Sequence, residues 1–130
     1  MSVTQDLRLR IGKETLGICR LDGQAAVPDW VQGSFVSVTR TAGELSIVCP
    51  QEYIPASVPC EGDWRYLVIE GSLDFSLVGV LASISGALAR KGISVFVIST
   101  YDTDYILVKE PALAKAVEAL VEEGHRVIPA

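Results

Sequence analysis

Residues 65–100 decide the fold, and they read RYLVIEGSLDFS followed by LVGVLASISGALARKGISVFVIST. The first six residues are rich in β-branched and aromatic side chains and predict a strand, which ends at Gly71. Apolar side chains then recur at helical spacing and predict a helix from residue 77 to residue 91, ended by Gly92. The apolar positions are Leu77, Val80, Leu81, Ile84 and Leu88. A continuous β-branched run over 95–100 predicts the next strand.

The rest of the C-terminal half completes this pattern. Residues 101–104 have turn chemistry, and 105–108 are the expected partner strand. A second helix is predicted from Pro111 to Glu123, followed by a short strand over 126–128. Its expected apolar side consists of Leu113, Val117, Leu120 and Val121. The expected fold class is α+β, a ferredoxin-like βαββαβ unit with two helices on one face of a four-stranded antiparallel sheet.

The N-terminal half is predicted to be rich in β-strands. Strands are expected over 7–11, 15–21, 35–39 and 44–48, while the intervening segments are too short and too rich in proline for long helices. A shift of about sixty residues superposes strand, turn, strand and proline from the two halves, with Pro50 falling on Pro111. This predicts a degenerate copy in residues 1–62 and an intact unit in 63–130. Chance similarity between two apolar hairpins is the alternative.

The composition restricts the classes of partner and site that we expect for this protein. The 130 residues are 49% hydrophobic with a mean hydropathy of +0.36, which predicts a folded core. A net charge of −5 with scattered basic residues makes nucleic acid and membranes poor partners. Cys19, Cys49 and Cys60 lack any Cys-x-x-Cys pair and predict reduced thiols, without a disulfide framework or a zinc site. No signal peptide and no long apolar run is visible, so a cytoplasmic location is expected.

Several stretches resemble the ACT domain family. Gly79-Val80-Leu81 opens the first helix and Gly92-Ile93-Ser94 opens the second strand in the way those domains do. Residues 74–79 and 98–109 resemble small bacterial tandem-ACT proteins, to which the ACT modules of the cytosolic arginine sensor of animal cells are similar. Residues 37–50 resemble the N-terminal half of the same subfamily. The resemblance covers nearly the whole chain and implies a regulatory protein that binds a small ligand such as an amino acid.

The resemblance places a ligand beside the loop that precedes the first helix. The candidate residues are Asp74, Phe75, Ser76, Leu77, Val78, Gly79 and Val80. Backbone N–H groups at a helix N-terminus can bind a carboxylate, and Asp74 could accept a hydrogen bond from an ammonium group. Alternatively, Asp74 or Ser76 only caps the helix, and Gly79 only allows close packing. The loop lacks the proline of the commonest ACT loop, so ligand geometry cannot be copied from ACT domains linked to enzymes.

The turn between the two central strands is the second candidate surface. Its residues are Ser99, Thr100, Tyr101, Asp102 and Thr103. Their hydroxyl groups could bind the polar end of a ligand, and Asp102 and Asp104 would suit a cationic side chain. In ACT domains this edge of the sheet tends to lie near an interdomain cleft. The alternative is that both aspartates are ordinary turn residues that hydrogen-bond their own backbone.

No catalytic machinery is visible in the sequence. His125 is the single histidine, it follows a predicted helix end, and no nucleophile–base set or phosphate-binding loop is present. We therefore expect no enzyme activity, no cofactor and no metal. The expected function is an amino-acid-binding sensor or allosteric module. The alternative is a ligand-free interaction module, such as a homodimer formed through sheet or helix faces. The sequence does not name the ligand, and arginine is suggested by analogy alone.

Overall fold

The computed structural model describes residues 7–70 and 79–130, and it consists of two compact units. One unit contains the chain up to Lys13 together with Arg65–Ala130, and the other is Glu14–Trp64. Strand β5 (Cys60–Ile69) crosses the boundary, so that its first part pairs within one unit and its second part within the other. Residues 7–13 therefore pack with the C-terminal unit, whereas the sequence had grouped them with the N-terminal half.

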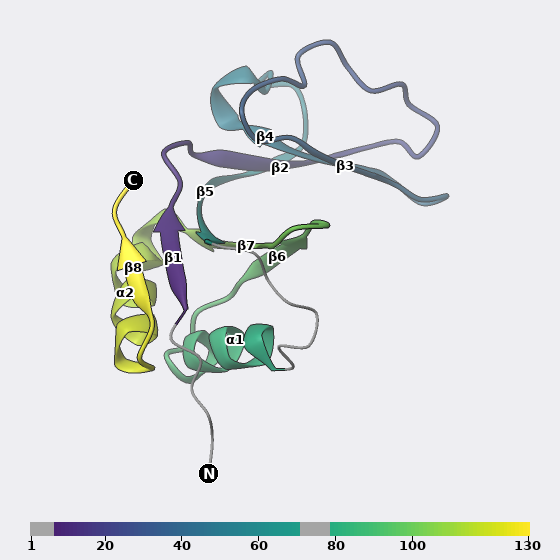
Figure 1. Ribbon diagram of the computed structural model, residues 1–130. Helices are drawn as coiled ribbons and strands as arrows, with labels where there is room; N and C mark the ends of the chain where they lie inside the picture. Colours follow the sequence, from purple (N-terminus) through teal and green to yellow (C-terminus); the bar gives the residue numbers. More distant parts are fainter. Residues whose placement is uncertain (1–6, 71–78) are drawn as a thin grey trace. The chain divides into compact units, whose positions relative to one another are not determined.

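The C-terminal unit has the predicted βαββαβ order (Figure 1). After β5 come α1 (Val80–Arg90), β6 (Phe96–Ser99), β7 (Asp104–Lys109), the short 3-10 helix η2 (Glu110–Ala112), α2 (Leu113–Glu122) and β8 (Arg126–Ile128). Strand β7 pairs with both β5 and β6, as the split βαβ arrangement requires. The α+β, ferredoxin-like fold expected from the sequence is thus confirmed.

One strand was not expected in this sheet. Strand β1 (Arg8–Ile11) lies between β5 and β8, antiparallel to β5 and parallel to β8. Leu9 is opposite Ile69 on one side and Val127 on the other, and it is fully buried. The prediction of a four-stranded antiparallel sheet was therefore wrong. The sheet has the order β8-β1-β5-β7-β6, because a fifth strand lies between β5 and β8, the first and last strands of the βαββαβ unit.

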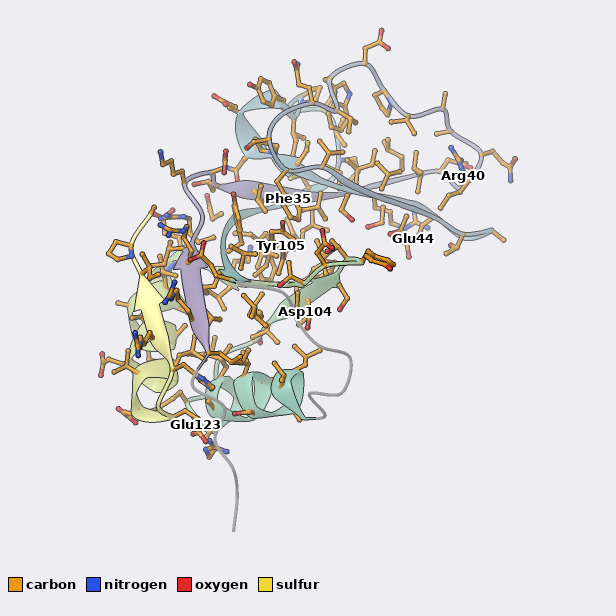
Figure 2. The ribbon with its side chains drawn as sticks, viewed as in Figure 1. Phe35, Arg40, Glu44, Asp104, Tyr105 and Glu123 are labelled. Atoms are coloured by element: carbon orange, nitrogen blue, oxygen red, sulfur yellow. The ribbon has the colours of Figure 1, made fainter. Side chains whose placement is uncertain are left out.

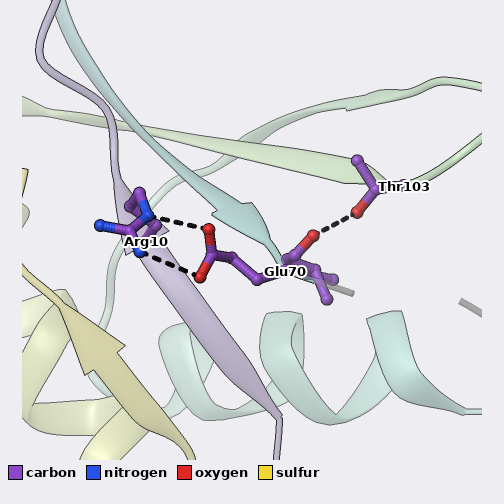
Figure 3. Close-up of polar contacts among 4 residues, drawn as sticks. Arg10, Glu70 and Thr103 are labelled. Atoms are coloured by element: carbon purple, nitrogen blue, oxygen red, sulfur yellow. Dashed lines mark hydrogen bonds and ion pairs between the residues drawn. The ribbon is translucent and has the colours of Figure 1, made fainter. Parts of the chain in front are cut away.

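Polar contacts fix the end of β5 to this inserted strand (Figure 3). Arg10 Nε and Nη2 donate to the two carboxylate oxygens of Glu70 at 2.8 and 3.2 Å. The Glu70 N–H also donates to the Arg8 carbonyl at 2.8 Å. The hydrogen bond to Arg10 lowers the pKa of the Glu70 carboxyl, and the same contact raises the pKa of the guanidinium. The direction in which the chain leaves β5 is therefore set by a two-bond ion pair.

The core of the C-terminal unit lies between its sheet and its two helices. Helix α1 buries Val80, Ile84, Ala87 and Leu88, and α2 buries Ala116, Ala119 and Leu120. The sheet contributes Leu9, Leu67, Ile69, Ile106 and Val108. Small alanines on α2 allow close packing, whereas Val121, predicted to face the core, is 54% exposed. At the C-terminal ends of α1 and α2, Arg90 forms an ion pair with Glu123, and Lys91 forms one with Glu122.

His125 is part of this core. Its side chain is 3% exposed, its Nδ1 accepts the Leu7 N–H at 3.3 Å, and its Nε2 lies 3.4 Å from the Ser83 hydroxyl. With Nδ1 acting as acceptor, the ring proton lies on Nε2 and faces Ser83. The histidine therefore links the start of β1 to α1. Its surroundings give it a structural role at a buried position, where the sequence had suggested only a helix end.

The N-terminal unit repeats the same strand order with almost no helix. It contains β2 (Leu16–Leu21), β3 (Ser37–Arg40), β4 (Leu45–Pro50), the 3-10 helix η1 (Gln51–Tyr53) and the first part of β5, in the sheet order β3-β4-β2-β5. This is the strand order of a split βαβ sheet, and the described segment 22–36 stands where its first helix would be. An offset of 59 residues places the pair Ser37↔Val48 on Phe96↔Leu107. This offset differs from the 61 residues that place Pro50 on Pro111, so the two units share a hairpin arrangement while the duplication stays a prediction.

Replacement of Leu120 by Ala should strongly destabilise the protein. The side chain is fully buried between α2 and the sheet, so its truncation should reduce the free energy of unfolding by about 2–5 kcal/mol. The neighbouring replacement Val121→Ala is the matched control, and it should change the free energy by no more than about 0.5 kcal/mol. Chemical denaturation measures both. Equal losses for the two variants would contradict the assigned helix orientation.

Replacement of Glu70 by Gln should destabilise the protein at neutral pH but not in acid. Because the folded state lowers the pKa of Glu70, the ion pair contributes stability above the ordinary glutamate pKa of about 4.3 and loses it as the pH falls through the lowered value. The free energies of unfolding of the wild-type and variant proteins, measured by urea titration, should therefore become equal toward low pH. Glu118→Gln, at an exposed position on α2, is the control. A difference in the free energy of unfolding that persists unchanged in acid would show that Arg10 does not stabilise the carboxylate.

Candidate functional site

The hairpin turn that forms the second candidate surface contacts the end of β5. The hydroxyl of Thr103, in the turn between β6 and β7, donates to the Ile69 carbonyl at 2.7 Å (Figure 3). Ile69 is the last residue of β5, and the loop 71–79 starts two residues later. Because β5 and β7 are neighbours in one sheet, Ile69 and Thr103 come into direct contact although they are 34 residues apart in the sequence.

Most of the predicted loop residues lie outside the described part of the chain. These are Asp74, Phe75, Ser76, Leu77 and Val78. Gly79 and Val80, the last two residues of that prediction, are described. The Val80 side chain is 5% exposed and packs in the core, which leaves only its backbone for a ligand.

Gly79 caps the N-terminus of α1 in a left-handed conformation. Its φ is 88°, and no described atom lies within 4 Å of the position that a Cβ would occupy. Glycine is therefore needed for its backbone conformation and not for close packing, which was one of the two expectations. The Gly79 carbonyl accepts the N–H of Ser83 at 2.9 Å, the first hydrogen bond of the helix. The N–H groups between them are the usual unpaired donors of a helix N-terminus.

Threonines, not aspartates, build the hairpin turn. The Thr100 N–H donates to the Thr103 carbonyl at 2.8 Å, and the Thr103 N–H donates to the Thr100 hydroxyl at 3.2 Å. The sequence had suggested that Asp102 and Asp104 would hydrogen-bond the turn backbone. Instead, the Asp104 carboxylate accepts the hydroxyl of Ser99 across the hairpin. Three of the five candidate side chains here, those of Ser99, Thr100 and Thr103, thus hold the turn in shape.

Tyr101 and Asp102 form the tip of this turn. Both are exposed, and the Tyr101 side chain is 88% accessible. Asp104 and Tyr105 follow at the start of β7, as Figure 2 shows. Consecutive strand residues point to opposite faces, and the Tyr105 ring lies 6.1 Å from that of Tyr66. The tip therefore presents a carboxylate and an aromatic ring on a hairpin whose Thr103 is bonded to the end of β5.

Residues that support the site were missed by sequence reasoning. Arg10, Glu70 and the Ile69 carbonyl fix the point at which the loop leaves the sheet, from the β1 side and from the β7 side. The alternation of Leu7, Leu9 and Ile11 with Arg8 and Arg10 did indicate a strand with one charged face. Its pairing partner, almost sixty residues away in sequence, has no local signal.

Other kinds of site find no support among the described residues. Across 7–70 and 79–130, no three His, Cys, Asp or Glu side chains are grouped so that they could hold a metal ion. Within the same ranges, no helix is both long enough and apolar enough to cross a membrane.

Comparison with known proteins supports the fold and gives the family. A family model described as an ACT domain matches residues 60–122, and a model for an N-terminal domain matches residues 14–57. The crystal structure of protein Atu0741 from Agobacterium tumefaciens is 36% identical, with a TM-score of 0.92, over 97% of this chain and 95% of that one. The regulatory subunit of aspartate kinase from Thermus thermophilus shares the fold at 10% identity, with a TM-score of 0.59, over 87% of this chain and 96% of that one.

A curated relative is also similar over part of the chain. The human protein named cytosolic arginine sensor for mTORC1 subunit 1 is 40% identical over 58 residues, which are 44% of this chain. The match spans 18% of the length of that relative. The βαββαβ unit, the β-rich unit before it and these similarities lead to one conclusion: the chain belongs to the ACT domain family, with its ACT domain in the C-terminal half.

Proposed function

We propose that this protein binds a small ligand of the amino-acid class and acts as a regulatory sensor, with no catalytic activity. The observation that supports this most strongly is the hydrogen bond from Thr103 to the Ile69 carbonyl. It holds the hairpin turn against the end of β5, and we propose that the ligand binds at this position.

The chemistry of that position suits an amino acid. The N-terminus of α1 offers backbone donors and the positive end of a helix dipole, which favour a carboxylate. The exposed carboxylate of Asp102, and Asp74 in the loop, would accept hydrogen bonds from an ammonium or another cationic group. The relatives agree with this class of ligand, since one is named an arginine sensor and another is a regulatory subunit. Arginine itself is a proposal by analogy.

Regulation would follow from differential binding. A ligand can shift only those conformations for which it has different affinities, and the proposed ligand-binding residues belong to two separate segments of the chain, 74–80 and 99–103. A ligand that contacts both would stabilise their juxtaposition. A partner protein could then recognise that arrangement, in a cell compartment that we propose to be the cytoplasm.

A thermal-shift screen of the twenty amino acids tests ligand binding. At a concentration about 100 times its Kd, a ligand should contribute about 2.7 kcal/mol and raise the Tm measurably. Asp74→Ala should abolish the shift, and Asp29→Ala, at an exposed position in the N-terminal unit, should preserve it. If no amino acid raised the Tm at millimolar concentration, the proposal would be abandoned.

Two glycine variants in one helix test whether the start of α1 must keep its conformation. Gly79→Ala forces alanine into a left-handed conformation and should cost about 1–2 kcal/mol, with a loss of ligand affinity. Gly86→Ala, inside the same helix, should instead stabilise the protein by up to about 1 kcal/mol and leave affinity unchanged. Denaturation and isothermal titration measure the two effects. Unchanged affinity in Gly79→Ala would remove the α1 N-terminus from the site.

A ligand-free interaction module is the second candidate function. Among the described strands, β6 pairs only with β7, so one of its edges is available for another strand. A homodimer formed at this edge would account for a regulatory fold without a ligand. Light scattering gives the mass in solution, and a stable dimer with no thermal shift from any amino acid would favour this function over the first.

A further inference from the structure

Three cysteines that are far apart in the sequence share one face of the N-terminal sheet. In the β2–β4 pairing Gly17 is opposite Cys49, and in the β2–β5 pairing Cys19 is opposite Cys60. Gly17 and Cys19 are two residues apart on one strand and therefore face the same side. Cys19 and Cys49 are buried, and Cys60 is exposed. The sequence predicted separate reduced thiols, but the sheet brings them together.

Only one of the three possible pairs has the spacing of a disulfide. The Arg20 N–H donates to the Pro59 carbonyl, so the adjacent pair Cys19↔Cys60 is a non-hydrogen-bonded pair, with Cα atoms about 4.5 Å apart. Disulfides need a Cα separation of about 4.4–6.8 Å. Cys49 and Cys19 are diagonal neighbours at about 7–8 Å. Cys49 and Cys60 lie two strands apart and two residues out of register, which separates their Cα atoms by about 11–12 Å.

Gly17 gives the Cys60 thiol its place over β2. A Cβ at position 17 would lie 2.8 Å from Cys60 Sγ, closer than real side-chain atoms approach. The sulfur of Cys60 therefore points inward over the neighbouring strand, although the residue is exposed at the edge of the unit. Burial, and after it the charge and hydrogen bond of the Cys60 thiol, raise the pKa of Cys19 to about 12.

We propose that Cys19 and Cys60 are a redox modification site, which a peroxide oxidises to a reversible cross-strand disulfide. The exposed Cys60 reacts first. Its thiolate attacks one peroxide oxygen, the O–O bond breaks, and sulfenic acid and hydroxide form. The Cys19 sulfur then loses its proton and attacks the Cys60 sulfur. The S–O bond breaks, and hydroxide leaves with that proton as water.

The electrons balance over these two steps. Two thiols lose two electrons and two protons, and hydrogen peroxide is reduced to two water molecules. Conversion of Cys60 to the neutral sulfenic acid also removes its negative charge, which is one of the causes that raise the pKa of Cys19. The first step thus eases the second. A dithiol reductant returns both cysteines to thiols by exchange through a mixed disulfide.

The test uses the full chain and hydrogen peroxide. The reaction is stopped with acid, free thiols are alkylated in denaturant, and intact mass and peptide mapping are recorded. The expected result is that alkylated thiols fall from three to one, that the crosslinked peptides contain Cys19 and Cys60, and that dithiothreitol restores all three. The oxidised chain should also show a Tm several degrees higher, because the crosslink constrains the unfolded state.

Two variants separate this pair from the third thiol. Cys60→Ser, at an exposed position, should abolish the crosslink, and Cys49→Ala should retain it, provided that each variant melts cooperatively. A crosslink that contains Cys49 would overturn the proposal. It would equally be overturned if peroxide carried Cys60 to sulfinic acid without a crosslink, or if the crosslink appeared only in the unfolded chain. Peptide mapping of the wild-type chain decides the matter even if a variant fails to fold.

Discussion

Strand β5 is the element on which the rest of the structure depends. Its first residues pair with β2 in the N-terminal unit, and its last residues pair with β1 and β7 in the C-terminal unit. It is at once the final strand of one split βαβ pattern and the first strand of the next. Leu67 and Ile69, both buried, anchor the second core, and the chain leaves the strand between two polar contacts that flank the candidate site.

The C-terminal unit was largely predictable because its signals are local. Helical spacing at Val80, Ile84 and Leu88, and the β-branched run before Ser99, depend only on near neighbours in the sequence. Long-range pairing was not predictable. Nothing local to Leu9 says that it lies between Ile69 and Val127, and nothing local to His125 says that Leu7 and Ser83 surround its ring.

The candidate site shows the same division between local signals, which the sequence carries, and long-range contacts, which it does not. The hairpin turn was recognised from its hydroxyl and acidic residues, but the alternative that the aspartates hydrogen-bond the turn backbone does not describe Asp104. The threonines form hydrogen bonds with the turn backbone, because their hydroxyl groups reach across the tight turn. The Asp104 carboxylate instead accepts a hydrogen bond from the hydroxyl of Ser99 on the facing strand. Gly79 was expected either to admit a ligand or to allow close packing, whereas its positive φ is a property of the backbone that sequence spacing does not reveal. The contact between Thr103 and Ile69 emerges only from the sheet order.

The position of β1 has a consequence for the way the chain acquires its structure. The Leu7 N–H is bonded to His125, 118 residues further along, and β1 is parallel to β8. During vectorial synthesis, Glu14–Trp64 can complete its pairings before the C-terminal unit is made, whereas β1 can pair with β5 early but with β8 only after α2 has been made. Contacts of such large sequence separation slow folding, since a long loop must close before they stabilise anything. The pairing of β1 with β8 is therefore among the last contacts to form.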